Sequence, residues 1–418
     1  MADDAILTLN AGSSSLKFAV YLRGADGLAL HSKGQVEGIG TAPHLIARDA
    51  GGKVLAERRW SEGERQTHED FLARFLGAVE PYLGAAKLVG VGHRIVHGGT
   101  RFTESVRVTP EVMDALEALV PLAPLHQPHN LAAIRAVAKL RPGLAQIACF
   151  DTAFHHVRPD LTTRIALPRA LADEAGIRRY GFHGLSYEYL AGALRERAPE
   201  LAQGRVIAAH LGNGASLCAM RDGRSVDTTM GFTALDGLVM GTRAGALDPG
   251  VVLYLMQQRG MSAAEVETLL YEQSGLLGVS GISSDMRALT ASRDPQASEA
   301  VALFCFRAAW QAGGLAVSLG GLDGLVFSAG IGEHAPEVRA GICAHLAWIG
   351  VALDEAANRA GRERISTEAS RVQVWVIPTD EEAVIARDTA RLLAAPLTQP
   401  SPQGRGLSSP PPSERGPG

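Results

Sequence analysis

Small polar residues follow a short apolar strand near the middle of the sequence, and their types suit the binding of phosphate. Residues Ile207 to His210 predict a strand, Gly212-Asn213-Gly214 forces a turn, and Ser216 to Met220 resumes the apolar pattern. Glycines let backbone N–H groups approach an anion closely, and asparagine adds a donor without negative charge. A Gly-Asn-Gly turn can also simply close a hairpin, so the neighbouring residues must decide between the two interpretations.

Further hydrogen-bond donors follow this turn. Thr228 and Thr229 supply hydroxyl groups, and Arg243 lies within a second glycine-rich turn, Gly241-Thr242-Arg243-Ala244-Gly245. Backbone amides, hydroxyls and a guanidinium group together suit a polyphosphate. We therefore predict a phosphate site within residues 207–250.

An early segment repeats the same pattern about half a chain earlier. Strands are predicted for Ile6 to Leu9 and Leu16 to Leu22, separated by a polar turn that carries Asn10 and Ser15. A second pair of apolar strands, Lys87 to His93 and Leu325 to Gly332, follows in the same order, and both end in glycine-rich turns. Two repeats in matching order predict a duplicated α/β protein whose strand ends face a shared cleft.

Helices are expected between these strands, and two of them carry a capping signal. Asn130 is well placed to cap a helix through Leu131 and Val137, and Thr379 with Glu382 fits a capping box for a helix from Glu381 to Leu393. Apolar residues at helical spacing also predict helices over residues 71–83 and 112–120.

The composition limits the partners and the compartment. The 418 residues are 46% hydrophobic, carry a formal charge of -4 and have a pI near 6.4, which gives no electrostatic footprint for nucleic acid or an anionic membrane. Four widely spaced cysteines among apolar neighbours predict reduced core residues. The acidic N-terminus lacks the features of a signal peptide, and Leu315 to Ile331 is too interrupted for a membrane span. We expect a cytoplasmic protein with no nucleic-acid or membrane partner, ending in a disordered tail rich in proline, serine and glycine at residues 396–418.

Charged and polar residues with catalytic potential lie at the predicted strand ends. Arg94 lies between apolar positions, so its charge needs either a structural carboxylate or a bound anion. Asp151 ends an apolar strand, where a catalytic or metal-linked acid and a helix N-cap are the alternatives. His126, in a proline-fixed turn, is either a site residue or a satisfied polar residue. His183 lies between two glycines, but no zinc-ligand spacing accompanies it, which excludes a zinc site.

Ten segments in one order, from Leu7 to about Leu393, strongly resemble the acetate kinase (acetokinase) family. They read LNAGSSSLKF, GHRIVHGG, PLAPLHQPHN, FDTAFH, RRYGFHGLS, HLGNGAS, MGTRAG with DPG, GVSGISSDMR, AGIGEHAPEVR and PTDEEAVIAR. The resemblance implies two duplicated actin/Hsp70-like ATPase domains of ribonuclease H-like fold around a central cleft. Their boundaries would be residues 1–152 plus 383–395 for an acyl-side domain completed by the C-terminal helix, and residues 153–382 for a nucleotide-binding domain. It also implies a homodimer that reversibly transfers the γ-phosphoryl group of ATP to acetate, giving acetyl phosphate and ADP, with Mg²⁺ or Mn²⁺.

The resemblance assigns roles to individual residues. Asp151 would be the active-site acid, and His183 and Arg243 would stabilise the transition state. Arg94 would hold the acetate carboxylate, and Asn10 and Glu381 would bind the metal. The residues implied to wall the methyl pocket are Val96, Leu125 and Phe182. Those implied to bind the nucleotide are Lys17, the loop His210, Leu211, Gly212, Asn213 and Gly214, the loop Asp285, Met286 and Arg287, and the loop Gly330, Ile331, Gly332, Glu333 and His334.

Four positions depart from the commoner family pattern, although none removes a charged catalytic group. Ala234 stands where proline often lines the methyl pocket; the others are Ala246, His334 and Asp380. Ala234 could enlarge the pocket, so a short-chain acyl kinase that prefers propionate or butyrate is the alternative function. A non-kinase ATPase of the same fold is a more remote alternative, since it should lack both a carboxylate-binding arginine and a small apolar pocket.

Overall fold

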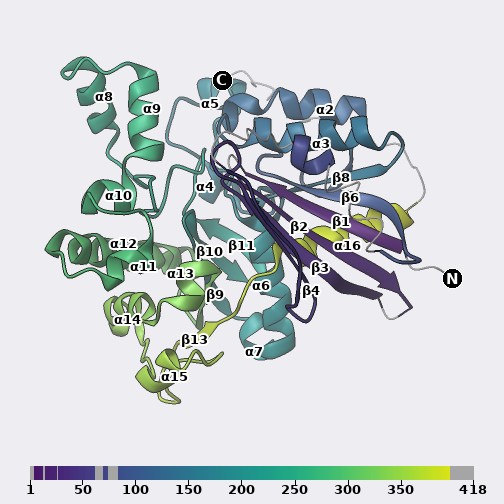
Figure 1. The fold of residues 1–418 in the computed structure, drawn as a ribbon. Coiled ribbons are helices and arrows are strands. Elements are labelled where there is room, and N and C mark those ends of the chain that lie inside the picture. The colour runs from purple at the N-terminus through teal and green to yellow at the C-terminus, as the bar shows by residue number, and fades with distance from the viewer. Residues whose placement is uncertain (1–3, 13–14, 26, 62–68, 74–82, 396–418) are drawn as a thin grey trace, which may run out of the picture.

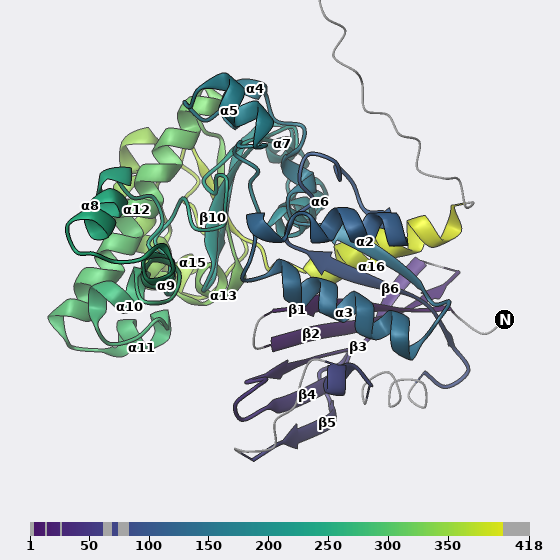
Figure 2. The same cartoon turned by 90° about the horizontal axis from the view of Figure 1, so that it is seen from above.

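The computed structural model describes residues 4–12, 15–25, 27–61, 69–73 and 83–395, which form two α/β units side by side (Figure 1). Each unit is built on one mixed β-sheet with helices on both faces (Figure 2).

The first sheet has the strand order β5-β4-β3-β2-β1-β6-β8-β7. Its central strand β1 pairs antiparallel with β2 and parallel with β6, which in turn pairs parallel with β8. The strands are β1 (Asp4–Ala11), β2 (Ser15–Gly24), β3 (Gly27–Glu37), β4 (His44–Asp49), β5 (Val54–Arg59), β6 (Lys87–Ile95), β7 (Val106–Arg107) and β8 (Ala145–Phe150).

The second sheet has the order β11-β10-β9-β12-β13 and the same pairing directions. Its central strand β9 pairs antiparallel with β10 and parallel with β12, and β12 pairs parallel with β13. The strands are β9 (Arg205–Leu211), β10 (Ala215–Arg221), β11 (Arg224–Thr228), β12 (Gly324–Ser328) and β13 (Gln373–Val376). The series β3-β2-β1-β6-β8 therefore matches β11-β10-β9-β12-β13 strand for strand, and the predicted duplicated α/β fold is confirmed.

Helices connect these strands and flank both sheets. Those that precede the second sheet are α2 (Pro110–Glu117), α3 (Gln127–Leu140), α4 (Asp160–Thr163), α5 (Arg169–Glu174), α6 (Gly184–Arg197) and α7 (Pro199–Ala202). The later ones are α8 (Pro249–Gln257), α9 (Ala263–Glu272), α10 (Gly275–Ser280), α11 (Met286–Ala291), α12 (Pro295–Leu319), α13 (Ala329–His334), α14 (Pro336–His345), α15 (Glu355–Arg359) and α16 (Glu381–Ala394). Short 3-10 turns are η1 (Val120–Leu122), η2 (Ala153–His155) and η3 (Ala347–Ile349).

The alternation of side chains along each strand decides which helix covers which face. In β2, Phe18 packs in a cluster with Val137 of α3, whereas Ala19 and Tyr21 pack with Ala386 of α16. Successive side chains of a strand point to opposite faces, so α3 and α16 cover opposite sides of the first sheet. In the second sheet, α6 and α12 are divided in the same way. Helix α16 follows β13 of the second sheet yet packs on β1, β6 and β8, so the chain returns to the first unit at its end.

Helix α12 is the one helix in the described part of the chain that is long and apolar enough to cross a membrane. Length and composition alone are weak evidence, because a core helix passes the same test. Here α12 packs against β9, β10 and β11 and buries a row of alanines that includes Ala300 and Ala308, so it is a core element of the second unit. The apolar stretch from Leu315 to Ile331 is divided between α12, β12 and α13.

Both predicted helix caps are wrong, for different reasons. Helix α3 begins at Gln127, so Asn130 lies inside its first turn, and its side chain bonds the Ala11 carbonyl and the Val96 amide instead. Helix α16 is capped by Asp380, whose side chain accepts a hydrogen bond from the Ala383 amide.

The other local predictions have mixed outcomes. The helix expected over 112–120 ends at Glu117. Part of the helix expected over 71–83, and all of the predicted tail at 396–418, lie outside the described residues. The four cysteines are buried and free, as predicted.

Candidate active site

Arg94 and Asp151 form an ion pair between the ends of β6 and β8, in which Asp151 is buried and Arg94 is partly buried. The Nε of Arg94 donates to both oxygens of Asp151 at 3.0 and 3.1 Å, and Nη2 donates to Oδ2 at 2.6 Å. Burial lowers the pKa of Arg94, but the Asp151 carboxylate outweighs this and raises it above its usual value. Burial raises the pKa of Asp151, and the Arg94 guanidinium acts in the opposite direction. The acidic partner expected for Arg94 is therefore Asp151, which does not cap a helix.

Arg94 keeps hydrogen-bonding capacity beyond this pair. Its Nη1 also donates to the Asn10 side chain at 3.2 Å, on the neighbouring strand β1. A guanidinium group has five N–H donors. The contacts with Asp151 and Asn10 use the single Nε–H and one N–H on each of Nη1 and Nη2. The second N–H of Nη1 and that of Nη2 have no hydrogen-bond acceptor within the described part of the chain. These two can receive a second carboxylate.

His183 is held beside Asp151 by a close backbone contact. Gly184 begins α6 and donates its N–H to the Asp151 carbonyl at 2.8 Å, and a side chain at Gly184 would place its Cβ 2.2 Å from that oxygen. His183 itself has a left-handed backbone with φ 58°, which is rare for a residue other than glycine. Such backbone strain is maintained only where the surroundings fix it, and it is common at functional sites.

The two glycine-rich turns predicted to bind phosphate lie against each other. Gly241 donates its N–H to the Asn213 carbonyl at 2.9 Å, and a Cβ at Gly241 would clash with the Asn213 side chain. A Cβ at Gly214 would lie 3.5 Å from Nε2 of His183 and 3.9 Å from Nη1 of Arg243. The imidazole, the guanidinium group and the bare backbone of the turn therefore converge on one point.

Arg243 is positioned by residues from both units. Nη1 donates to the Ala234 carbonyl at 3.1 Å, and Nη2 lies 3.2 Å from Nε2 of His126, which precedes α3. Burial is the main cause that lowers the pKa of His126 to about 3, and the positive charges of Arg243 and Arg94 lower it further. His126 is consequently neutral near pH 7 and accepts the hydrogen bond from Arg243. The sequence alone left the role of His126 open.

A small apolar cavity of about 10 Å³ lies beside Arg243. This volume corresponds to about one water-sized sphere, which suits one methyl group. Its lining residues are Val96, Leu122, Ala123, Pro124, Leu125, His126, Phe182, Ala234 and Tyr271. The three residues expected to wall a methyl pocket are among them. Tyr271, from the end of α9, could not be predicted from the sequence. It reaches the cavity only because α9 packs against the glycine-rich turn that carries Arg243.

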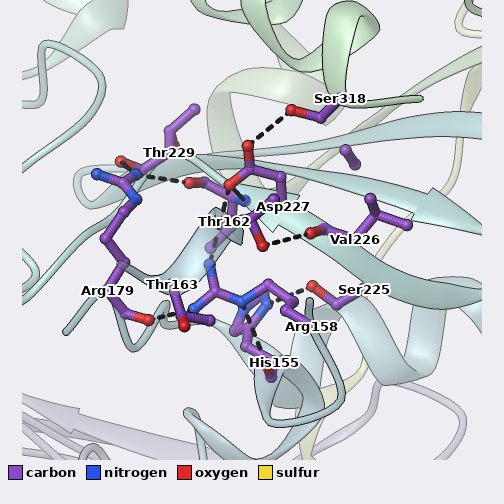
Figure 3. Close-up of polar contacts among 12 residues, drawn as sticks. His155, Arg158, Thr162, Thr163, Arg179, Ser225, Val226, Asp227, Thr229 and Ser318 are labelled. Atoms are coloured by element: carbon purple, nitrogen blue, oxygen red, sulfur yellow. Dashed lines mark hydrogen bonds and ion pairs between the residues drawn. The ribbon is translucent and has the colours of Figure 1, made fainter. Parts of the chain in front are cut away.

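Three histidines connect the site to the second sheet. The rings of His183 and His210 stack with their centroids 4.2 Å apart, and Nδ1 of His210 lies 2.8 Å from the Ser186 hydroxyl, which donates to Thr379. Burial lowers the pKa of His183 well below its usual value, and it lowers the pKa of His210 to about 3. Behind the site, His155 bonds the Phe182 carbonyl at 2.9 Å. It also bonds the Ser225 hydroxyl at 2.8 Å (Figure 3).

The expected nucleotide loops surround the end of the second sheet. Gly330 to His334 fall within α13, directly after β12, and the Glu333 carboxylate accepts the backbone N–H groups of Ala329 and Thr379. Asp285 caps α11 and pairs with Arg287 at the surface. The side chains of Leu211 and Met286 are buried in the core, so only their backbone groups are available to a ligand. Lys17 is exposed on β2, opposite Asn10 in the strand register.

Asn10 and Glu381 would be only two protein ligands for a metal ion, and Mg²⁺ commonly binds through that number of protein ligands. In the described part of the chain, no group of three or more His, Cys, Asp and Glu residues is arranged to hold a metal ion. Mg²⁺ usually binds one or two carboxylates together with waters and substrate phosphates. Oxygen donors from Asn10 on β1 and from Glu381, the first residue of α16, fit that chemistry.

Comparisons with known proteins agree with this arrangement. The acetokinase family model matches residues 5–387. The acetate kinase of Rhodopseudomonas palustris (strain TIE-1) is 54% identical over 394 residues, which cover 93% of this chain and 98% of that protein. The crystal structure of Porphyromonas gingivalis acetate kinase is 37% identical, with a TM-score of 0.82 over 93% of this chain and 100% of that one. A propionate kinase structure from Francisella tularensis subsp. tularensis SCHU S4 is 35% identical, with a TM-score of 0.85 over 94% and 100%.

Both the family match and the relative of 54% identity extend over almost the whole described chain, including every segment that forms the site. This chain therefore belongs to the acetokinase family.

Proposed function

We propose that this protein transfers the γ-phosphoryl group of ATP to acetate, giving acetyl phosphate and ADP, and that the reaction is reversible. The single observation that carries this proposal is the methyl-sized apolar cavity beside Arg243, at the point where the two units meet. A sugar would need several polar partners for its hydroxyl groups, which this lining does not offer. The relatives of 50–54% identity are acetate kinases, which supports the same substrate.

The chemistry requires alignment and charge compensation rather than a strong base. Acetate is already ionised near pH 7, so no proton has to be removed before it attacks phosphorus. The difficulty is that the acetate and the phosphoryl group are both anions. The remaining N–H donors of Arg94 bind the acetate carboxylate, Arg243 offsets charge on the transferring group, and His183 donates a hydrogen bond to it. Asp151 orients Arg94, and the methyl group in the cavity holds the carboxylate in line.

The nucleotide is assigned to the loops that surround the second sheet. In this assignment Lys17 and the turns at residues 210–214, 285–287 and 330–334 contact ATP, with backbone groups alone at Leu211 and Met286. Bound Mg²⁺, or Mn²⁺ in its place, would neutralise phosphate charge, and Asn10 and Glu381 would hold it. The nucleotide-binding domain comprises residues 153–382, and the acyl-side domain comprises residues 1–152 with 383–395. The protein is assigned to the cytoplasm, in keeping with its four free cysteines.

The same proposal includes a homodimer, for which an exposed apolar groove on the second unit is the natural interface. The groove encloses about 740 Å³ over α12 and shares no lining residue with the cavity beside Arg243. Its exposed apolar residues include Trp310 of α12 and Trp348 of η3, exposed by 59% and 73%, and Phe306 and Val317. Such contiguous apolar surface is uncommon on a monomer.

Polar contacts fix the floor of this groove. Asp227 on the edge strand β11 accepts a hydrogen bond from Ser318 of α12 at 2.8 Å, and Arg179 donates to the Thr229 carbonyl at 3.1 Å (Figure 3). Because the Ser318–Asp227 contact ties α12 to the sheet edge, the exposed aromatic residues form a fixed surface that a second copy of the chain can cover.

The direct test measures initial rates with Mg-ATP and acetate, propionate or butyrate, with hydroxylamine to trap the acyl phosphate. We expect the highest kcat/KM for acetate. Equal or better turnover of propionate would make the protein a broader acyl kinase. ADP formation without acyl phosphate from any of the three acids would instead favour a non-kinase ATPase.

A further inference from the structure

Two buried hydroxyl groups connect Tyr187 to the imidazole of His183. The Ser216 Oγ lies 2.8 Å from Nδ1 of His183, and the Tyr187 hydroxyl lies 2.5 Å from the same Oγ. Ser216 and Tyr187 are completely buried. The other ring nitrogen of His183, Nε2, faces the Gly-Asn-Gly turn and Arg243, where the proposed phosphoryl transfer takes place.

The supply of donors and acceptors determines which way the protons point. The Tyr187 hydroxyl is completely buried, so leaving its proton without an acceptor would be costly. Among the described residues the hydrogen-bond partner of this hydroxyl is the Ser216 Oγ, which therefore accepts the phenol proton. Ser216, having accepted from Tyr187, has its own proton left for Nδ1 of His183.

We infer that the chain Tyr187–Ser216–His183 holds His183 as the neutral tautomer with its proton on Nε2, so that Ser216 and Tyr187 are positioning residues for the site. A neutral imidazole carries one proton. Because Nδ1 accepts a hydrogen bond from Ser216, this proton must be on Nε2. Second partners of histidine commonly fix the tautomer and ring orientation in this way.

The surroundings of His183 also keep its ring neutral. The charged and titratable groups that face it are Arg94 on β6, Arg243 in the glycine-rich turn, His210 on β9 and His155 in η2. Together with burial, these groups lower the pKa of His183, so a positively charged ring is disfavoured. The ring remains a hydrogen-bond donor through Nε2 without having to bind a second proton.

The catalytic consequence rests on the proposed phosphoryl transfer. A neutral Nε2–H donor offers the transferring group a hydrogen bond whose strength does not depend on pH between about 6 and 9. A histidine that acted as an imidazolium would instead lose activity as pH rises above about 6.5.

The tautomer is measured directly by nitrogen NMR of the full-length protein labelled with ¹⁵N-histidine, without substrates. His183→Gln assigns the His183 signals by their disappearance. We expect Nε2 of His183 to show the signal of a protonated nitrogen and Nδ1 that of an unprotonated one, unchanged between about pH 6 and 8. A protonated Nδ1, or an imidazolium signal near pH 7, would overturn the inference whether or not the protein is a kinase.

Two variants test the hydroxyl chain itself. Tyr187→Phe keeps the ring but leaves Ser216 free to accept from Nδ1–H, so we expect a shift toward the Nδ1–H tautomer. Ser216→Ala removes the contact, and we expect kcat to fall by about tenfold while KM for ATP changes little. If either variant folds with unchanged thermal stability and keeps both the wild-type tautomer and the wild-type kcat, the positioning role is wrong. Absence of acyl phosphate from the wild type would contradict the proposed function but not the tautomer.

Discussion

Nη2 of Arg243 lies 3.2 Å from Nε2 of His126, and this contact joins the two units at the candidate site. Arg243 belongs to a turn of the second unit, and His126 immediately precedes α3 of the first. Because His126 is neutral, it can accept the hydrogen bond without repelling the guanidinium group. The position of Arg243 therefore depends on both units.

Arg243→Ala should reduce turnover by on the order of a hundredfold or more, because it removes a donor that offsets charge in the transition state. The measurement is kcat for acetyl phosphate formation. Arg359→Ala is the matched control, since Arg359 is an exposed arginine with only a weak contact to Glu355. Turnover of Arg243→Ala close to that of the control would contradict the assignment.

Tyr271 should limit the size of the acyl group, because it closes one side of the 10 Å³ cavity. Tyr271→Ala should raise the ratio of kcat/KM for propionate over acetate by about tenfold, the usual effect of one methylene group in an apolar pocket. Tyr271→Phe keeps the shape of the ring and serves as the control, with a ratio near the wild type. The size limit would lie elsewhere if the alanine variant kept the wild-type ratio.

Stability should fall as the solution is acidified from about pH 6.5, the usual histidine pKa, toward pH 4. Burial lowers the pKa to about 4 for His93 and His97 and to about 3 for His126 and His155. These groups bind protons more readily in the unfolded chain over this range, so their contribution to stability is present above pH 6.5 and is lost as pH falls.

Urea unfolding at pH 7.5 and at pH 5 measures this effect. His155→Gln should reduce the difference between the two midpoints, whereas replacement of the exposed His334 by Gln should not change it. Equal midpoints at the two pH values for the wild type would show that these histidines do not titrate as expected.

Trp310→Glu should give a monomer, because it places a charge on the apolar groove over α12. Sedimentation velocity on the variant and the wild type measures the change. Glu299→Gln, at an exposed position near the start of the same helix, is the control and should leave the wild-type state unchanged. A wild type that is monomeric at micromolar concentration would remove the basis for a homodimer.

Much of the fold could be predicted because its signals are local. Glycine-rich turns between apolar strands mark both hairpins, β1 with β2 and β9 with β10, and the order of the repeats predicts the matching sheets. The caps could not be predicted in the same way. Asparagine often caps helices, but the side chain of Asn130 donates to the carbonyl of Ala11, which is 119 residues away. Only the tertiary fold supplies that partner.

The candidate site likewise contains residues that could be predicted from the sequence and residues that could not. Arg94 could be expected to need an acidic partner, since a buried guanidinium group is costly alone, and Asp151 satisfies it. His126, Tyr271 and Ser216 carry no such signal. Each meets the site through a contact with a residue far away in sequence, and a histidine, tyrosine or serine in isolation is compatible with many environments.

The return of α16 to the first sheet has a mechanical consequence. The chain passes between the two units twice, once after β8 and once after β13. Ser186, near the start of α6 after the first passage, donates to Thr379 on the second at 2.9 Å. Two attachments held together in this way permit rotation about the line that joins them but resist sliding and twisting. Asp151, His183 and Glu381 lie on or next to these passages, close to the axis of such a rotation. A rotation of the two units about this axis would therefore displace the proposed nucleotide loops far more than Asp151, His183 and Glu381.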